Sequence, residues 1–340
     1  MDFKKALFFL LLSSEAFANN CIENKYIFDF GSGSLKAAGY VVNSCNNTIE
    51  EHLPKYNKVL DIQKCILQSK NGKTLSRECI TKSIAAVNEI KKLYNTDCFN
   101  NECIGFATAW ARNINNSGSV FSQLFQQTKI DFSIVSQEKE GILVLEAAKM
   151  HLPSTHINDE TIIFDSGGGS FQLSGFNKQE QHFVFQGKYG SATMLHELNN
   201  IFNKGNKYEL ISKKDIKKAL EYVNKIVATN ITHDRNLTSL ITKKDLKVYS
   251  LSGFVQYGIK HNLGFTEDTI TISDLEKMIE ESATNSFAQM KKKYPNYLID
   301  NQAGLLLVYA VVKALRVDKF VHISEDTKDY LALNPGIVIN

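Results

Sequence analysis

Short apolar runs alternate with stretches of helical periodicity along most of the chain. Five runs are short enough to be strands, at residues 103–108, 132–135, 161–165, 247–251 and 320–323. Helical spacing separates most of them, at residues 76–94, 120–128, 138–150, 191–202, 212–226, 274–290 and 303–315. Residues 53–75 are polar and irregular, and we expect a surface excursion there. The alternation of strands and helices predicts the α/β fold class.

Residues 162–176, IIFDSGGGSFQLSGF, predict a β-hairpin with a glycine-rich turn. The first strand ends near Asp165, and the turn consists of Gly167, Gly168, Gly169 and Ser170. Because glycine lacks a Cβ atom, several backbone N–H groups can point into one small space, which suits phosphate oxygens. An aspartate at the end of the strand can hold a hydrated Mg²⁺ against the same phosphates.

A second copy of this pattern lies 136 positions earlier, where residues 26–40 read YIFDFGSGSLKAAGY. Seven positions are identical in the two copies, and in the first copy they are Ile27, Phe28, Asp29, Gly31, Gly33, Ser34 and Gly39. The alternative is two unrelated tight hairpins. We favour two lobes, each carrying one phosphate-gripping hairpin, with the turns at 31–34 and 167–170 facing each other across a cleft.

The length of 340 residues suits two domains of ordinary size. We expect lobe I, with the first hairpin, over residues 19–155 and lobe II over residues 156–340. The helix at 303–315 is a candidate to pack back on lobe I. A net charge of +3 is too small to indicate a nucleic-acid partner. The sequence makes no prediction about the oligomeric state.

The first 18 residues predict a secretory signal peptide. Lys4 and Lys5 precede the apolar residues 6–12, and Ala16-Phe17-Ala18 supplies a small-residue cleavage pattern. Later in the chain, no run of about 18 apolar residues occurs. We therefore expect an exported protein, periplasmic or secreted, without stable membrane association.

All six cysteines lie in the first third of the chain, at positions 21, 45, 65, 79, 98 and 103. An even number in an exported protein indicates disulfides. The sequence permits fifteen pairings, of which we favour Cys98–Cys103 and Cys65–Cys79. A metal site is the weaker alternative, because no Cys-x-x-Cys pair occurs.

Phosphoryl transfer also requires a cation near the transferred phosphate and a group that orients or deprotonates water. Arg112 follows the strand predicted at 103–108 and is a candidate for the cation. Glu138 and Glu140 open the helix after the strand at 132–135, so their side chains can reach the same end of the sheet.

With these motifs the chain resembles the exopolyphosphatase/guanosine pentaphosphate phosphatase (Ppx/GppA) family. That family has the two-lobed actin-like (ribonuclease H-like) ATPase fold, within the sugar kinase–Hsp70–actin superfold. DFGSGSLK is similar to the first phosphate motif of the family, with Gly33 replacing an asparagine, and ATAWAR is similar to the motif that ends in arginine. DSGGGSFQ is similar to the second phosphate motif, with Phe171 and Gln172 departing, and IVSQEKEG is similar to the segment that carries the catalytic glutamate.

The resemblance implies a Mg²⁺-dependent hydrolase that releases terminal phosphate from polyphosphate or from a nucleotide. Glu140 and Arg112 would be the catalytic residues, and Asp29 and Asp165 would position Mg²⁺. The residues implied in phosphate binding are Gly31, Ser32, Gly33, Ser34, Lys36, Gly167, Gly168, Gly169 and Ser170.

Two alternatives remain open. Secreted apyrases, which hydrolyse nucleoside tri- and diphosphates, share both hairpins, and their motifs are similar to residues 107–112, to Glu140-Gly141 and to Gln172. A phosphate- or nucleotide-binding module without catalysis is the second alternative, although a binder has no need of a carboxylate such as Glu140 facing bound anions. A serine hydrolase is excluded, because no serine has glycine both two residues before and two residues after it.

Overall fold

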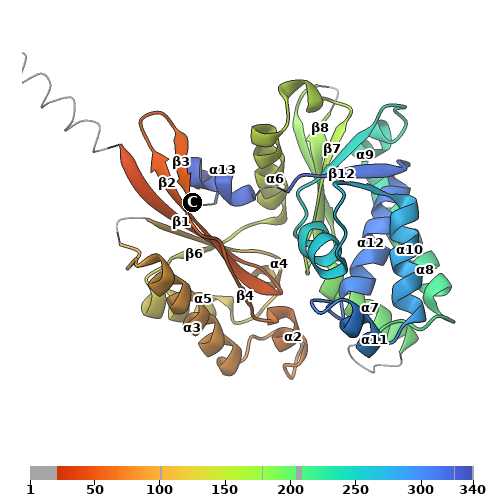
Figure 1. Cartoon of the computed structure of the whole chain (residues 1–340), viewed down its shortest axis with the longest axis horizontal. Coiled ribbons are helices and arrows are strands. Elements are labelled where there is room, and N and C mark those ends of the chain that lie inside the picture. The colour runs from red at the N-terminus through yellow and green to blue at the C-terminus, as the bar shows by residue number, and fades with distance from the viewer. Residues whose placement is uncertain (1–20, 100–101, 178, 204–208, 325, 339–340) are drawn as a thin grey trace, which may run out of the picture. The chain divides into compact units, whose positions relative to one another are not determined.

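The computed structural model describes residues 21–99, 102–177, 179–203, 209–324 and 326–338. The predicted signal peptide, residues 1–18, therefore lies outside the described residues. The chain divides into two compact units, which we describe separately (Figure 1). Of the described residues, those within 21–107, 111–135 and 328–338 form unit 1, and those within 108–110 and 136–327 form unit 2.

Unit 1 is built on a six-stranded mixed sheet in the order β3-β2-β1-β5-β6, with β4 also pairing with β2. Its strands are β1 (Ile22–Phe30), β2 (Ser34–Asn43), β3 (Thr48–His52), β4 (Tyr56–Val59), β5 (Cys103–Ala107) and β6 (Phe132–Ile134). Strands β1, β5 and β6 run parallel to one another. Their carboxyl ends therefore share one edge of the sheet.

Capping residues determine where the helices of unit 1 begin and end. In α3 (Arg77–Tyr94), the Ser76 hydroxyl caps the first turn by accepting from the Cys79 N–H, and Ile80, Ile84 and Val87 form the buried stripe. The helix ends at Asn95, which adopts a left-handed conformation. The remaining helices are α2 (Ile62–Leu67), α4 (Ala109–Arg112, which spans the unit boundary), α5 (Ser117–Thr128), α13 (Thr327–Leu333) and the 3₁₀ helix η3 (Pro335–Ile337).

The C-terminal segment belongs to unit 1 although the chain before it belongs to unit 2. Asp329 in α13 is buried and accepts a 2.7 Å hydrogen bond from the Tyr40 hydroxyl in β2. A buried hydrogen bond to a carboxylate ties the end of the chain to the first hairpin.

Unit 2 is built on a second six-stranded mixed sheet, in the order β11-β12-β10-β7-β8-β9. Its strands are β7 (Thr161–Ser166), β8 (Phe171–Phe176), β9 (His182–Gly187), β10 (Lys247–Ser250), β11 (Thr269–Thr271) and β12 (Lys319–His322). Strands β7, β10 and β12 are parallel and end at the same edge. The two mixed sheets with their helices confirm the α/β class predicted from the sequence.

Helices cover both faces of this sheet (Figure 1). Helix α6 (Gln137–His151) packs on β7, β8 and β9, while α12 (Asn301–Ala314) lies on the other side among α7, α8 and α10. The other elements are η1 (Ser154–His156), α7 (Ser191–Phe202), α8 (Ile216–His233), α9 (Arg235–Leu240), the π-helix η2 (Phe254–His261), α10 (Ile272–Thr284) and α11 (Phe287–Lys293).

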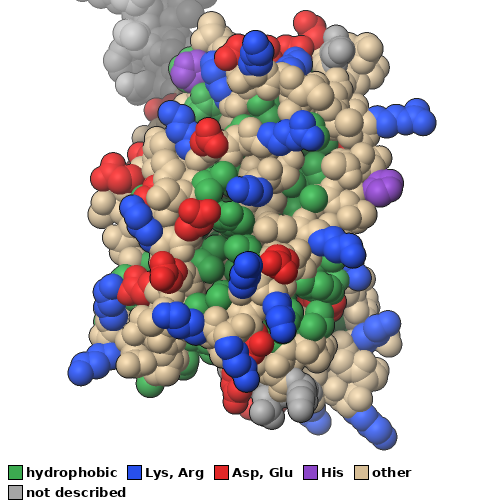
Figure 2. Space-filling model, turned by 90° about the vertical axis from the view of Figure 1, so that its right-hand side faces the viewer, with side chains coloured by type: hydrophobic (Ala, Val, Ile, Leu, Met, Phe, Trp, Pro, Cys, Tyr) green, Lys and Arg blue, Asp and Glu red, His purple; other side chains and the backbone are tan. Residues whose placement is uncertain are grey.

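Helix α12 is apolar on all sides because it forms the centre of the helical layer. Residues 303–312 are all buried. Helix α8 is amphipathic instead, with Ala219, Val223 and Val227 facing inward at intervals of four. On the outer face that carries α8 and α10, charged side chains of both signs surround a strip of apolar ones (Figure 2). Within the described residues, we find no helix with the length and apolar character needed to cross a membrane.

Several predicted elements need correction. Residues 53–75 are not an irregular excursion, since they contain β4 and α2. The single helix predicted at 274–290 is two helices, because Ser286 caps a new one by accepting from the Gln289 N–H. The helix predicted at 212–226 begins at Ile216 and continues to His233.

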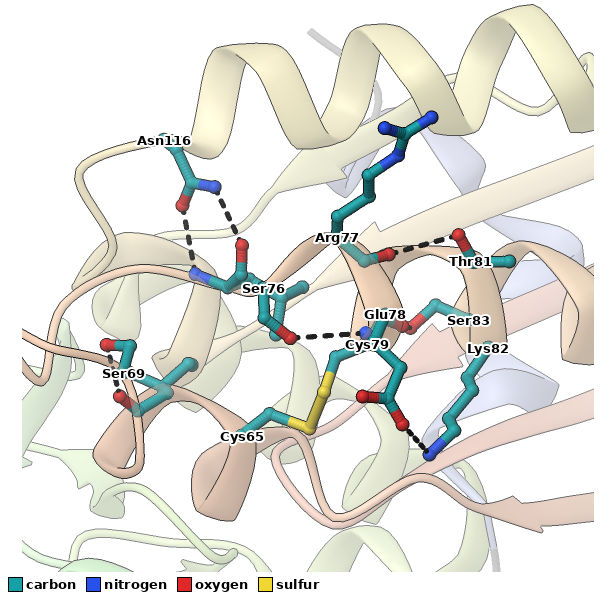
Figure 3. Close-up of a disulfide and its surroundings, with 12 residues drawn as sticks. Cys65, Ser69, Ser76, Arg77, Glu78, Cys79, Thr81, Lys82, Ser83 and Asn116 are labelled. Carbon is teal, nitrogen blue, oxygen red and sulfur yellow. Dashed lines mark hydrogen bonds and ion pairs between the residues drawn. A yellow bond between two sulfur atoms is a disulfide. The ribbon is translucent and has the colours of Figure 1, made fainter.

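Three disulfides cross-link unit 1: Cys21–Cys45, Cys65–Cys79 and Cys98–Cys103. The two favoured pairings are confirmed. Cys65–Cys79 joins α2 to the first turn of α3, beside the Ser76 cap (Figure 3). A helix of only six residues is not stable on its own, so this disulfide stabilises α2.

Candidate active site

The two glycine-rich turns have the same internal geometry. In the first, the Gly31 N–H donates to the Ser34 carbonyl oxygen at 2.9 Å. In the second, the Gly167 N–H donates to the Ser170 carbonyl oxygen at 3.0 Å. Each turn joins two antiparallel strands, β1 to β2 and β7 to β8. The internal repeat in the sequence therefore corresponds to a repeat in structure.

The carbonyl oxygens of the first turn are engaged by the segment that leads into α2. Leu60 and Asp61 donate their N–H groups to the Gly33 oxygen at 2.9 and 3.0 Å, and Gln63 donates to the Ser32 oxygen at 2.9 Å. With its carbonyls turned toward a helix N-terminus, this turn is left with N–H groups for a ligand.

The second turn repeats this arrangement with the N-terminus of α7. Ser191 donates its N–H to the Gly167 oxygen at 3.0 Å, and Ala192 donates to the Gly168 oxygen at the same distance. Thr193 completes the set, because its hydroxyl donates to the Gly169 oxygen at 3.2 Å. Both turns are therefore built to present N–H groups rather than carbonyls, which favours an anion.

The N-cap of α7 is Gly190, the residue before the helix predicted at 191–202. A Cβ atom on Gly190 would stand within 2.4–2.5 Å of backbone atoms of Gly167, Gly168 and Gly169. The Ser191 hydroxyl donates to Asp300 at 2.7 Å, which anchors α7 to the start of α12. Gly190 thus allows the helix to approach the second turn, a role that the sequence pattern did not reveal.

The predicted metal ligands occupy equivalent places in the two hairpins. Asp29 lies opposite Lys36 across β1 and β2, and Asp165 lies opposite Gln172 across β7 and β8. Both aspartates are partly exposed at the carboxyl end of their strand. Gln172 is buried and donates to the Ser170 hydroxyl at 3.2 Å, so it supports the second turn.

Phe171, which departs from the family motif, packs in the hydrophobic core and not against the turn. Its ring is buried and packs against Phe164 and Phe185, with centroids 6.3 and 5.8 Å apart. A Cβ atom on Gly187 would lie 2.2 Å from this ring, so the glycine at position 187 leaves space for the Phe171 side chain. The substitution at 171 is therefore accommodated by packing within unit 2.

Arg112 stands at the edge of unit 1 where β5 and β6 end. Its guanidinium donates to the Val135 carbonyl oxygen at 2.7 Å, and the Val135 N–H donates to the Ala107 oxygen at 2.9 Å. Because Asp29 is near the carboxyl end of the parallel strand β1, the structure brings Asp29, the first turn and Arg112 to one edge.

Glu140 lies in the first turn of α6 in unit 2. The Ser136 hydroxyl caps this helix by accepting from the Lys139 N–H, and the Glu140 N–H donates to the Ser136 backbone carbonyl oxygen. Glu140 is partly buried, whereas Glu138 is exposed. The side chain of Gln137 ties the start of α6 to the ends of β8 and β9. Glu140, Asp165 and the second turn thus belong to one edge of the unit 2 sheet.

The same edge carries a buried histidine at the end of β12. His322 is 4% exposed, pairs with Ser250 in the sheet, and its Nε2 lies 2.7 Å from the Gln256 side-chain oxygen. Burial, reinforced by the charge of Lys260, lowers its pKa to about 4. His322 is therefore neutral near neutral pH.

The donor set suits a hydrated Mg²⁺. Mg²⁺ keeps several waters and is usually held by one or two carboxylates together with phosphate oxygens of the substrate. One aspartate stands beside each turn. Among the described residues we find no cluster of three or more His, Cys, Asp or Glu side chains able to hold a metal, and this type of site needs none.

Solved structures identify the fold. The PPX-GPPA enzyme of Aquifex aeolicus aligns with a TM-score of 0.67 and 16% identity, over 92% of this chain and 99% of that one. An exopolyphosphatase of Cytophaga hutchinsonii aligns with a TM-score of 0.69 and 12% identity, over 92% and 98%. Together with the paired hairpins and sheets, these likenesses define an α/β protein of the actin-like ATPase fold.

The family follows from the sequence match. The model described as the Ppx/GppA phosphatase family matches residues 57–327. The bifunctional 3-dehydroquinate synthase/phosphatase of Fusobacterium nucleatum is 22% identical over 250 residues, which is 69% of this chain. The chain spans only 37% of the length of that relative. The chain belongs to the Ppx/GppA phosphatase family, as the resemblance implied.

Proposed function

We propose that this protein is an exported, Mg²⁺-dependent hydrolase that releases the terminal phosphate of polyphosphate by direct attack of water. The observation that carries the proposal is the repeated turn, in which a helix N-terminus engages the carbonyls and leaves N–H groups for phosphate oxygens. Two such turns, each with an aspartate at the end of its first strand, suit a phosphoanhydride better than a neutral substrate.

The two sets of residues would act on the same terminal phosphoryl group. The Gly31 and Gly167 N–H groups are bonded within their turns, so the N–H groups of residues 32–34 and 168–170 bind its oxygens, and Arg112 and Lys36 neutralise its charge. Glu140 orients the attacking water and accepts its proton. As the water oxygen bonds to phosphorus, the anhydride P–O bond breaks and the shortened phosphate chain leaves. No phosphoenzyme forms.

Asp29 and Asp165 would hold Mg²⁺, largely through water. When bound, the ion neutralises phosphate charge and holds the oxygens in position. The three disulfides of unit 1 support export, because disulfides form and persist in oxidising compartments. The N-terminal sequence pattern supports export too.

A nucleotide is the second candidate substrate. Gln172 lies opposite Asp165 and supports Ser170, and a glutamine stands at this position in the apyrase motif that the sequence resembles. Hydrolysis of nucleoside tri- and diphosphates uses the same attack of water on a terminal phosphoryl group. The two candidate substrates differ only beyond the terminal phosphoryl group, so binding of the rest of the molecule determines which one is hydrolysed.

Phosphate release from long-chain polyphosphate, ATP and ADP, each with Mg²⁺ and with EDTA, tests the proposal. We expect release from polyphosphate that EDTA abolishes. Faster release from ATP and ADP would favour the nucleotide activity. Binding of these anions without release of phosphate from any of them would contradict the proposed function.

A further inference from the structure

Gln137 makes two contacts that link α6 to the second hairpin. Its side-chain nitrogen lies 3.0 Å from the carbonyl oxygen of Phe171 and 2.7 Å from that of Gly187. Both partners are acceptors only, so the amide must present its two N–H groups, one to each oxygen. The side chain is half-buried, where such bonds compete less with water.

The two acceptors mark the place where the second turn departs from the sheet. Phe171 follows Ser170, the last residue of the turn, and is paired with Gly187 across β8 and β9. Three residues after Gly187 comes Gly190, which lies against the turn. Gln137 therefore bonds to both chain segments that support the turn.

A second anchor lies one helical turn further along α6. A Cβ atom on Gly141 would stand 2.3 Å from Val184 and 2.7 Å from the Ser174 hydroxyl, so the helix touches the sheet there. Residues 137 and 141 lie on the same face of a helix, because they are four positions apart. Glu140 lies between these two anchors, so its backbone is held to β8 and β9 from both sides.

We infer that Gln137 is a positioning residue, which holds the Glu140 carboxylate at a fixed distance from the phosphate-binding turn. The inference rests on the proposed function. An aspartate or asparagine is one methylene too short to reach both carbonyls, and an ionised glutamate offers them no donor.

The tests are the variants Gln137→Ala and Gln137→Glu, with Gln126→Glu in the exposed face of α5 as the matched control. For Gln137→Ala we expect kcat to fall about 100-fold, as a shift of about 1 Å in a catalytic group can cause. KM should change little, because the turn still binds phosphate. The control should retain wild-type kcat and KM.

Gln137→Glu should change the pH dependence of kcat, which a merely structural role of Gln137 would leave unchanged. When protonated, the new carboxyl can donate one of the two hydrogen bonds, and when ionised it repels both carbonyl oxygens. The ratio of variant to wild-type kcat should therefore be highest at low pH and fall as the new carboxyl ionises. A ratio that is constant across pH would overturn the inference.

Hydrogen exchange tests the anchoring role of Gln137 independently of catalytic activity. In Gln137→Ala, the hydrogen-bonded amides of Lys139, Glu140 and residues 171–173 should exchange at least about tenfold faster, while the first hairpin remains unchanged. Unchanged exchange at these amides, or full kcat in Gln137→Ala, would overturn the inference. Failure of the proposed function would look different: wild-type protein would release no phosphate from any anhydride.

Discussion

Gly190 lies so close to Gly167 that a Cβ atom at position 190 would stand 2.4 Å from the Gly167 carbonyl oxygen. Real Cβ atoms do not approach backbone this closely, and the atoms concerned belong to the turn itself. Any larger residue at 190 must therefore displace either the turn or the start of α7. The N–H groups that we propose to bind phosphate would move with the turn.

The first prediction concerns Gly190→Ala. We expect kcat/KM to fall about 100-fold or more, because a shift of about 1 Å at a binding site can have that effect. Steady-state phosphate release measures it. Gly118→Ala is the control, since Gly118 is exposed in α5 and a Cβ atom there meets nothing within 4 Å. Comparable losses in both variants would contradict the role of Gly190.

The second prediction concerns metal dependence. Asp165→Asn keeps the size of the side chain and removes its charge. We expect the Mg²⁺ concentration for half-maximal activity to rise about 10–100-fold, the range that altered metal environments show. Asp131→Asn, at an exposed position before β6, should leave the Mg²⁺ titration unchanged. An unchanged titration for Asp165→Asn would remove Asp165 from the metal site.

The hairpins could be predicted because their signal is local. Glycines at fixed offsets from an aspartate determine the turn, and the repeat at residues 26–40 and 162–176 gave each copy support from the other. Helix α12 was equally accessible, since its apolar run is too long for a strand and too short to span a membrane. The position of Glu140 at the start of a helix followed from the strand predicted at 132–135.

The parts that escaped prediction depend on contacts between distant residues. Helix α2 has only six residues, and its stability comes from Cys79 and from the turn carbonyls of Ser32 and Gly33. Gln137 bonds to residues 34 and 50 positions away, and no periodicity encodes such a pair. The role of Gly190 likewise depends on a backbone 23 residues earlier. Local pattern predicts elements, whereas these contacts arise from packing.

The third prediction concerns the Cys65–Cys79 disulfide. Its loop of 14 residues suggests that the double variant C65S/C79S loses about 3 kcal/mol of stability. We also expect kcat to fall, because the segment before α2 engages the carbonyls of the first turn. Chemical denaturation and phosphate release measure the two effects.

C98S/C103S is the control for this disulfide. Cys98–Cys103 closes a loop of only five residues, for which a loss of about 2 kcal/mol is expected. It should lower stability and leave kcat near the wild-type value. If both double variants lost kcat equally, the loss would reflect general destabilisation and the link between α2 and the first turn would be refuted.

The fourth prediction is a loss of stability in acid caused by His322. Its pKa is about 4 in the folded protein and about 6.5 in the unfolded chain, so the unfolded state binds more protons between these values. The contribution is complete above pH 6.5 and is lost as pH falls toward 4. The total is on the order of 3 kcal/mol.

His322→Gln isolates this contribution because glutamine does not titrate. Lys260 and Asp268, whose charges act on His322, stay in place in the variant, as do all other carboxyl groups. The free energy of unfolding, measured with denaturant between pH 4 and 7.5, should fall less steeply for the variant. Parallel curves for the two proteins would show that His322 does not titrate as its burial implies.

The last prediction is the catalytic base. Glu140→Gln keeps the shape of the side chain and removes the group that accepts the proton from water. We expect kcat to fall about 10²–10⁴-fold, the usual range for general-base catalysis, while KM changes little. Glu138→Gln is the internal control, because Glu138 opens the same helix but is exposed, whereas Glu140 is partly buried next to the Gly141 contact with the sheet. If Glu138→Gln abolished turnover and Glu140→Gln did not, the base would be assigned to the wrong carboxylate, and the anchoring role inferred for Gln137 would have to be tested against Glu138 instead.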